Sequence, residues 1–224
     1  SKLESISPVD LFDLKTLTSE VPQTNLTDIL NHVAPSFNST TQTVADGTDH
    51  VDPATVRGLG PDQTLVLING KRRYTSALVN VNGTMGRGSV GTDLNAIAAA
   101  SIDKIELLRD GAAAQYGSDA IAGVVNIIMR TDAAGGSISA SHGGYYRGDG
   151  MSTDGSVNFG IPIGATGFLN VTGLVRDHGF SNAGGPDQRV ERAIASGAHL
   201  EWSKLADYPL VNKVFGDARY ELFV

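Results

Sequence analysis

The sequence predicts an α+β region followed by a region of antiparallel β-strands, and three observations support this division. Residues 105–128 hold two apolar, strand-like runs with a short run of helix formers between them. Before residue 131, apolar residues cluster in short runs that are typical of buried strands and helices. After residue 136, apolar and polar residues alternate with the period of a strand that has one apolar face. We therefore expect a small mixed sheet with short helices, and then long antiparallel strands.

The first elements follow from apolar spacing. Residues 9–12 predict a strand, and residues 25–33 predict a helix because their apolar residues recur at i, i+3, i+4 and i+7. Thr24 or Asn25 is the expected N-cap of this helix. Residues 37–53 consist mostly of Ser, Thr, Asn, Asp and Gly, which favours an exposed loop.

The middle of the region predicts a buried strand at residues 64–69. The pair Asn69 and Gly70 at the end of this strand is a strong turn signal. A polar loop with several glycines occupies residues 74–92, and we expect a short helix near residues 94–100.

The last part of the region predicts a strand, a helix and a second strand. The strands are expected at residues 102–108 and 124–128. Between them, Asp110 is the expected N-cap of a helix that begins near Ala112, and Gly117 offers the left-handed residue that ends it.

The second region predicts about four strands. We expect them at residues 137–146, 153–161, 166–176 and 214–224. The connections are a tight turn at residues 162–165 and a long polar stretch at residues 177–212. Short turns that alternate with long loops are typical of an outer-membrane barrel. A soluble antiparallel sheet would show the same alternation of side chains.

Composition excludes several classes of protein. The chain has 224 residues and no cysteine, so it has no disulfide or thiolate metal site. Its formal net charge of -7 argues against nucleic-acid binding. No apolar run reaches the roughly eighteen residues of a membrane-spanning helix. The N-terminal residues lack the features of a signal peptide, so we expect a mature or trimmed chain.

Motifs for catalysis or metal binding are not found. The five histidines have no metal-ligand spacing, and residues 58–63 lack the third glycine of a dinucleotide loop. Asp46, Asp49 and Asp52 share a loop but miss the calcium-binding pattern. Ser118 is not in a nucleophile elbow. We expect no enzymatic activity, no metal and no cofactor.

Three segments carry a resemblance to a known family. They read VRGLGPDQTLVLINGKRR (residues 56–73), DLNAIAAASIDKIELLR (residues 93–109) and IELLRDGAAAQYGSDAIAGVVNII (residues 105–128). Their order and spacing resemble those of the plug domain of TonB-dependent outer-membrane receptors, over about residues 9–131. The resemblance implies an α+β plug domain inside a barrel of about 22 strands.

The implied domain organisation is a plug domain at residues 1–131, a hinge at residues 132–136, and the first strands of the barrel at residues 137–224. Four strands cannot close a membrane barrel, because even small ones use about eight. We therefore interpret the sequence as a whole plug followed by antiparallel β-strands of an incomplete outer-membrane β-barrel.

The resemblance also implies a function in the outer membrane of a Gram-negative cell. The plug would gate ligand-triggered uptake of a siderophore or another scarce nutrient, energised by TonB of the inner-membrane complex. The TonB box would lie upstream of the segment at residues 7–17, where no convincing candidate is found, so we expect it to be missing. The other implied partner is the chain's own C-terminal barrel.

Two arginines match the family's motif positions. The resemblance implies that Arg57 and Arg109 lie on the flank of the plug and pair with glutamates of the barrel wall, as a plug–barrel latch. Guanidinium groups suit this task because they stay charged and bind carboxylates bidentately. The alternative is a local pair, for instance of Arg109 with Glu106 or Asp110.

Ligand contacts in the family come from outward plug loops, which correspond here to residues 39–53 and 71–92. The candidate ligand-binding residues of the second loop are Arg72, Arg73, Tyr74, Asn80, Asn82 and Arg87. Such side chains suit an anionic or hydroxyl-rich ligand, although connecting loops have a similar composition. The rival interpretation is a soluble secreted ligand-binding module or enzyme with a mixed β-sheet.

Overall fold

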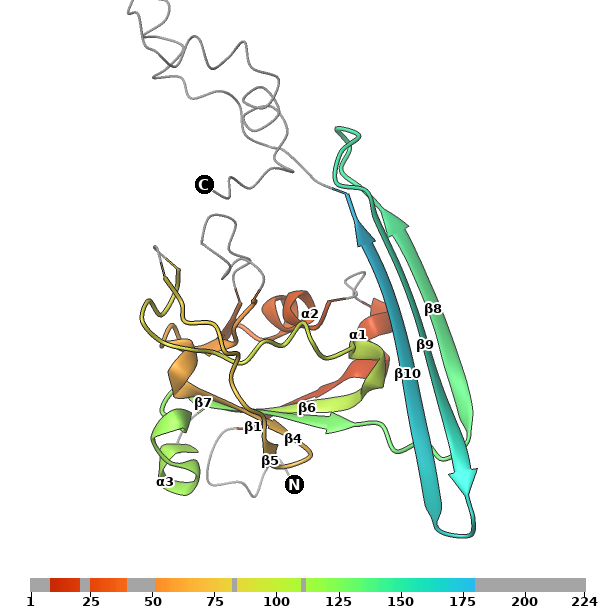
Figure 1. Ribbon diagram of the computed structural model, residues 1–224, viewed down its shortest axis with the longest axis horizontal. Helices are drawn as coiled ribbons and strands as arrows, with labels where there is room; N and C mark the ends of the chain where they lie inside the picture. Colours follow the sequence, from red (N-terminus) through yellow and green to blue (C-terminus); the bar gives the residue numbers. More distant parts are fainter. Residues whose placement is uncertain (1–8, 21–24, 40–50, 82–83, 110–111, 180–224) are drawn as a thin grey trace, which may run out of the picture. The chain divides into compact units, whose positions relative to one another are not determined.

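The computed structural model describes residues 9–20, 25–39, 51–81, 84–109 and 112–179. Two compact units contain them, one formed by residues 1–139 with 156–174 and the other by residues 140–155 with 175–224. The described strands form sheets of five, three and two strands (Figure 1).

The five-stranded sheet is mixed, as the sequence predicts. Its order is β1 (Val9–Asp13), β6 (Ile102–Leu108), β7 (Gly123–Met129), β4 (Thr64–Ile68) and β5 (Lys71–Arg72). The β4–β7 pair is parallel and the other neighbours are antiparallel. The parallel pair lies at the centre of the core, which agrees with its nearly continuous apolar sequence.

Both faces of this sheet are covered. On one face, Val66, Ile105 and Ile127 belong to the main core with residues of α1 (Leu14–Glu20) and α2 (Leu26–Val33). On the other, β4 and β7 pack against α3 (Ala112–Tyr116) and the 3₁₀ turn η4 (Ser118–Ala120). Figure 1 shows α2 and α3 on opposite sides of the sheet.

Local signals explain where several elements begin and end. The N-cap of α2 is Asn25, whose side chain accepts the amide of Thr27. Gly117 has a φ of 91° and ends α3. At the β4–β5 turn, Asn69 and Gly70 have φ angles of 50° and 76°, as the predicted two-residue hairpin turn requires.

Other elements differ from the sequence predictions. The helix expected near residues 94–100 is wrong, because only the 3₁₀ turn η3 (Ala99–Ser101) forms there. Asp93 accepts the amide of Asn95 at 2.9 Å, an Asx turn that competes with a helical start. The predictions missed α1 and η2 (Pro61–Gln63). The exposed loop expected from residue 37 is wrong at its start, because the buried Phe37 begins β2 (Phe37–Asn38), which pairs with β3 (Thr55–Val56). The expected cap Asp110 lies outside the described residues.

The three-stranded sheet is antiparallel, with the order β10-β9-β8 (Figure 1). Its strands are β8 (Gly135–Gly143), β9 (Ser152–Ile163) and β10 (Gly167–His178). The tight turn follows Ile163, slightly later than predicted, and the strand expected at residues 214–224 lies outside the described part. Among the helices of the described residues, none has the length and apolar character needed to cross a membrane.

Candidate functional site

The two predicted latch arginines lie close together. Arg57 follows β3 with a φ of 58°, and its Nη1 donates to the backbone oxygen of Arg109 at 2.8 Å. Arg109 follows β6 and pairs with Asp10 of β1, at 2.8 Å from Nε to Oδ2 and 3.2 Å from Nη2 to Oδ1. In this structure Arg109 therefore pairs with Asp10. Glu106 instead accepts a hydrogen bond from the side-chain amide of Asn126. The sequence carried no signal for Asp10, because only the pairing of β1 with β6 brings it near.

Arg72, a predicted ligand residue, makes contacts within the five-stranded region. Its guanidinium donates to the carboxylate of Asp119 and, at 2.7 Å, to the backbone oxygen of Tyr116. The hydrogen bond from Arg72, followed by one from Ser118, holds the pKa of the Asp119 carboxyl below its usual range. Arg72 thus ties β5 to the α3–η4 corner.

Arg73 and Tyr74 form a second local contact. The Arg73 guanidinium carbon lies 4.5 Å from the centre of the Tyr74 ring, within range of a cation–π interaction. The Tyr74 side chain is 75% exposed. This pair presents an aromatic face beside a positive charge to solvent.

Asn80 organises the loop that follows. It is buried, and its backbone N–H donates to the backbone oxygen of Ser89 at 2.8 Å. Its side-chain amide donates to the backbone oxygen of Met85 at 3.2 Å. Arg87 lies on the exposed part of this loop, while Asn82 lies outside the described residues. Of the predicted ligand residues that the structure describes, Arg72, Tyr74 and Arg87 are exposed. Arg73 is partly buried, and the buried Asn80 supports the loop.

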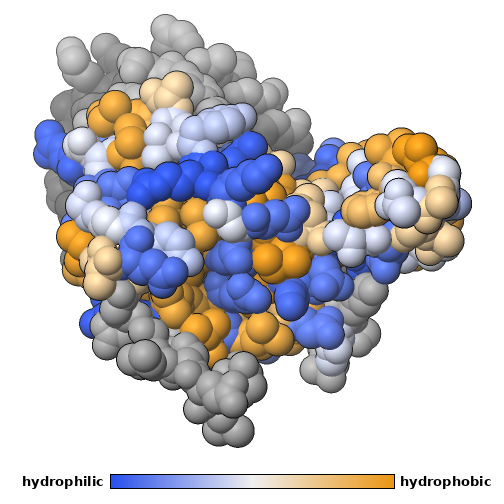
Figure 2. Space-filling model, turned by 90° about the horizontal axis from the view of Figure 1, so that it is seen from below, coloured by the Kyte–Doolittle hydropathy of each residue, from blue (hydrophilic) through white to orange (hydrophobic). Residues whose placement is uncertain are grey.

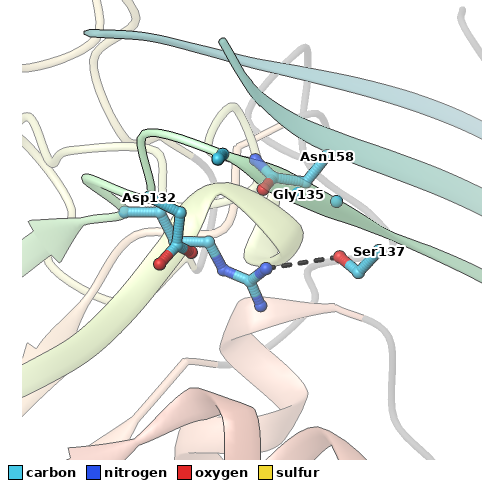
Figure 3. A pocket seen from close by; sticks show the side chains of 7 residues that line it. Asp132, Gly135, Ser137 and Asn158 are labelled. Carbon is cyan, nitrogen blue, oxygen red and sulfur yellow. Dashed lines mark hydrogen bonds between the residues drawn. The ribbon is translucent and has the colours of Figure 1, made fainter. Parts of the chain in front are cut away.

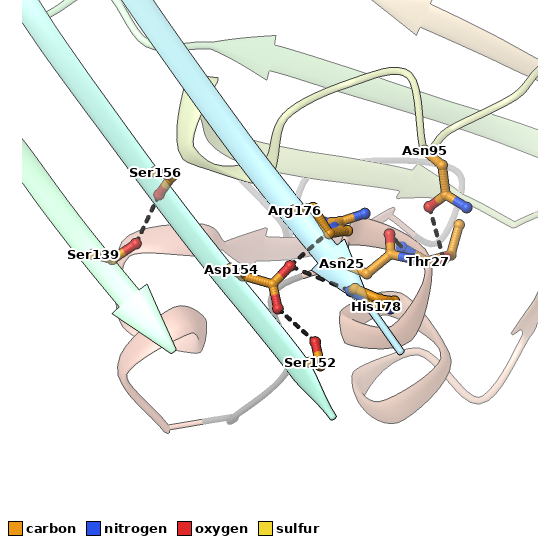
Figure 4. Close-up of polar contacts among 9 residues, drawn as sticks. All are labelled: Asn25, Thr27, Asn95, Ser139, Ser152, Asp154, Ser156, Arg176 and His178. Carbon is orange, nitrogen blue, oxygen red and sulfur yellow. Dashed lines mark hydrogen bonds and ion pairs between the residues drawn. The ribbon is translucent and has the colours of Figure 1, made fainter. Parts of the chain in front are cut away.

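A polar chain connects the neighbouring segments. The Thr27 hydroxyl donates to the Asn95 side-chain oxygen at 3.2 Å (Figure 4). The side-chain amide of Asn95 donates in turn to the carboxylate of Asp52. Burial raises the pKa of the Asp52 carboxyl, although the bond from Asn95 acts in the opposite direction. Sequence reasoning considered Asp52 only with Asp46 and Asp49, which lie outside the described residues. No group of three His, Asp or Glu side chains in the described chain has the geometry to hold a metal.

The three-stranded sheet buries polar side chains. Asp154 of β9 accepts hydrogen bonds from Ser152 at 2.9 Å and from Arg176 of β10 at 2.8 Å, and His178 Nε2 lies 3.4 Å away (Figure 4). Asn158 is only 2% exposed. Sequence reasoning missed the charged cluster, although Asp154 and Arg176 occupy polar positions of the alternating pattern.

The alternate positions of these strands are apolar and exposed. Figure 2 shows hydrophobic side chains gathered at the end of this sheet that holds the β9–β10 turn. The exposed apolar residues include Phe159, Ile161, Ile163, Leu169, Val171 and Val175. A sheet with hydrogen-bonded polar residues on one face and exposed apolar residues on the other has the pattern of strands that face lipid.

Comparison with known proteins places these features in a family. The family profile described as TonB-dependent receptor plug domain matches residues 1–124. The ferric enterobactin receptor PirA of Pseudomonas aeruginosa is 31% identical over 140 residues, which cover 62% of this chain and 19% of that protein. The vitamin B12 transporter BtuB of Vibrio cholerae is 36% identical over 130 residues, covering 56% of this chain and 18% of that one.

A solved structure agrees with the sequence comparison. A mutant of the ferric enterobactin receptor of Pseudomonas aeruginosa, in complex with enterobactin, is similar with a TM-score of 0.60 and 26% identity. The similarity covers 76% of this chain and 24% of that one. The chain thus spans about a fifth to a quarter of the length of these relatives.

Proposed function

The chain belongs to the family of TonB-dependent receptor plug domains, and on this basis we propose that it is the N-terminal part of an outer-membrane nutrient transporter. The family consists of receptors rather than enzymes, in agreement with the absence of a catalytic motif from the sequence. One observation carries the proposal beyond the plug. The plug segment continues directly into three strands with one hydrogen-bonded polar face and one exposed apolar face.

The proposed domains are a plug at residues 1–131, a hinge at residues 132–136 and barrel strands from residue 137 onward. Ligand binding on the outer side changes the plug, and TonB of the inner-membrane complex then acts on it to open a path. The remaining barrel and the outer membrane are the other partners. A siderophore is the ligand class to test first, because two of the similar proteins are ferric enterobactin receptors, and cobalamin is the second.

Uptake by cells tests this proposal. The full-length gene is expressed in a Gram-negative strain without its own receptors, and accumulation of iron-55 ferric siderophores and of labelled cobalamin is measured with and without TonB. We expect uptake of one of them that requires TonB. A protein that fractionates with the soluble periplasm and binds its ligand there would support the soluble-module alternative instead.

The latch proposal concerns Arg57 and Arg109. Their positions on neighbouring ends of β3 and β6 and their mutual contact support a shared role at one flank of the plug. In the full-length receptor, Arg57→Ala and Arg109→Ala should leave the barrel assembled but loosen the plug, by about 2–5 kcal/mol for a desolvated pair. Sensitivity to a large antibiotic that the outer membrane excludes should rise.

A matched variant separates the latch from the local pair. Asp10→Asn removes only the partner of Arg109 on β1. If Asp10→Asn and Arg109→Ala raise antibiotic sensitivity equally while Arg57→Ala does not, the arginines act through local contacts and the latch proposal fails.

Ligand recognition by the loop at residues 71–92 is a separate proposal. The exposed Tyr74 and Arg87, together with Asn82, supply hydrogen-bonding groups on a glycine-rich loop that a ligand can approach closely. Replacing all three with alanine should weaken ligand binding and leave the heat-modifiable gel mobility of the barrel unchanged. Unchanged affinity would assign recognition to the barrel loops.

A further inference from the structure

The backbone that leaves the five-stranded sheet runs against strand β9 at a glycine. A Cβ atom added at Gly160 would lie 2.1 Å from the backbone oxygen of Asp132 and 2.9 Å from the backbone nitrogen of Ala134. Ordinary van der Waals contact begins at 3.4 Å. Only glycine at this position of β9 lets residues 132–134 lie so close to the strand.

An amide side chain holds the same backbone. Asn170 of β10 donates from Nδ2 to the backbone oxygen of Asp132 at 3.3 Å. The buried Asn158 donates to Asn170 Oδ1 at 2.6 Å and to Thr172 Oγ1 at 2.7 Å, which fixes the orientation of the Asn170 amide. A buried asparagine with these partners is costly to leave unsatisfied, so the arrangement is well defined.

Space remains beside this contact. A cavity of about 270 Å³ is lined by Arg130, Asp132, residues 134–137 and Asn158 (Figure 3). The Arg130 side chain borders it and donates to the Ser137 hydroxyl and to the backbone oxygen of Ile102, both at 3.3 Å. Gly135 has a φ of 87°, and no atom lies within 4 Å of where its Cβ would be. The segment is therefore held at residues 132–134. It is close to β9 again at Gly136, where a Cβ would lie 2.4 Å from Cδ1 of Phe159.

We propose that Asn158, Gly160 and Asn170 form a seat that fixes the backbone of residues 132–134 on strands β9 and β10. These residues position the covalent link between plug and barrel strands, so that residues 132–134 stay on β9 and β10 when the plug moves. The inference rests on the proposed transport function, because the seat matters only if the plug moves.

Trypsin cleavage after Arg130 tests the seat, because cleavage requires the segment to leave its contacts. The folded full-length receptor in detergent is digested, and cleavage at this bond is followed by intact mass spectrometry. Asn170→Asp removes the donor to Asp132 and should raise the rate about fivefold, the effect of one hydrogen bond. Gly160→Ala and Gly160→Val should raise it more than about tenfold, because their Cβ displaces the backbone.

The matched control is Gly155→Val in the same strand, where a Cβ would meet no atom within 4 Å. Its cleavage rate should equal that of the wild type. If the glycine variants do not assemble a heat-modifiable barrel, the cleavage rate of the Asn170→Asp receptor alone tests the seat. An assembled Asn170→Asp receptor with the wild-type rate overturns the seat. Faster cleavage of the variants of a receptor that transports no nutrient would support the seat and contradict the proposed transport function. Failure of the seat proposal can therefore be distinguished from failure of the proposed function.

Discussion

The two larger sheets of this protein distribute polar side chains in opposite ways. The five-stranded sheet buries apolar residues on both faces and places its ion pairs, such as Arg72 with Asp119, at exposed edges. The three-stranded sheet buries Asp154 and Asn158 and exposes Phe159 and Val171. The first arrangement suits a region that is stable in water, and the second suits strands whose outer face meets lipid. One chain therefore contains two sheets that need different surroundings.

Solubility gives the largest expected difference between the two regions. Residues 9–131 expressed alone should be soluble without detergent, because their apolar residues are packed around their own sheet. Residues 132–224 should aggregate unless detergent is present, because an apolar sheet face is exposed. Size-exclusion chromatography with light scattering checks both. A monodisperse, cooperatively unfolding 224-residue chain in plain buffer would remove the contrast.

Truncation of apolar side chains should show the next largest difference. Ile127→Ala in the five-stranded sheet should lower the free energy of unfolding by about 3 kcal/mol, because this side chain is fully buried. Phe159→Ala in the three-stranded sheet should cost less than about 1 kcal/mol in detergent, because the ring is 46% exposed. Urea unfolding of the soluble plug region and of the full-length receptor gives the two values. Equal losses would contradict the assignment of the exposed face.

For ion pairs, the larger loss of stability is expected in the three-stranded sheet. Asp154→Ala should destabilise the barrel strands by about 2 kcal/mol, less than for a fully buried pair because Arg176 stays partly exposed. Asp119→Ala should change the stability of the plug region little, because its pair with Arg72 is exposed to solvent. Asp154→Asn is the control that keeps hydrogen bonding. A larger loss for Asp119→Ala would show that the edge pair is the stronger one.

The smallest expected effect is a pH dependence within the five-stranded region. Burial raises the pKa of Asp52, so its contribution to stability is present below its unfolded pKa of about 4 and is lost as the pH rises through the folded value. Asp52→Asn should remove this decline in urea midpoints measured between pH 4 and pH 7. The pKa of Asp119 is lowered, so its contribution is lost only as the pH falls through that lower value. Asp119→Asn should therefore leave the decline between pH 4 and pH 7 intact.

The candidate site was predictable from the sequence only in part. The motif segments pointed to Arg57 and Arg109, which follow β3 and β6, and the loop composition pointed to Tyr74 and Arg87, which are exposed. Arg72 and Asn80 have the same residue types but are engaged in contacts that support the loop and the α3–η4 corner. Residue type and spacing do not separate a side chain that meets solvent from one that bonds to its own fold.

The sequence by itself determined many of the local elements. Strands β4, β6 and β7, helix α2 and the turn at Asn69 follow from apolar period, capping and turn chemistry, which act over a few residues. The alternation after residue 136 likewise fixed which side chains share a face of β9 and β10.

Only the tertiary structure decided the partners. The pair of Asp10 with Arg109 joins residues 99 positions apart, and the contact of Asn170 with Asp132 joins residues 38 apart. The parallel pairing of β4 with β7 and the replacement of the expected helix at residues 94–100 by an Asx turn are of the same kind. Periodicity records which side chains are buried, but it does not record what they are buried against, because that depends on packing segments that are distant in the sequence.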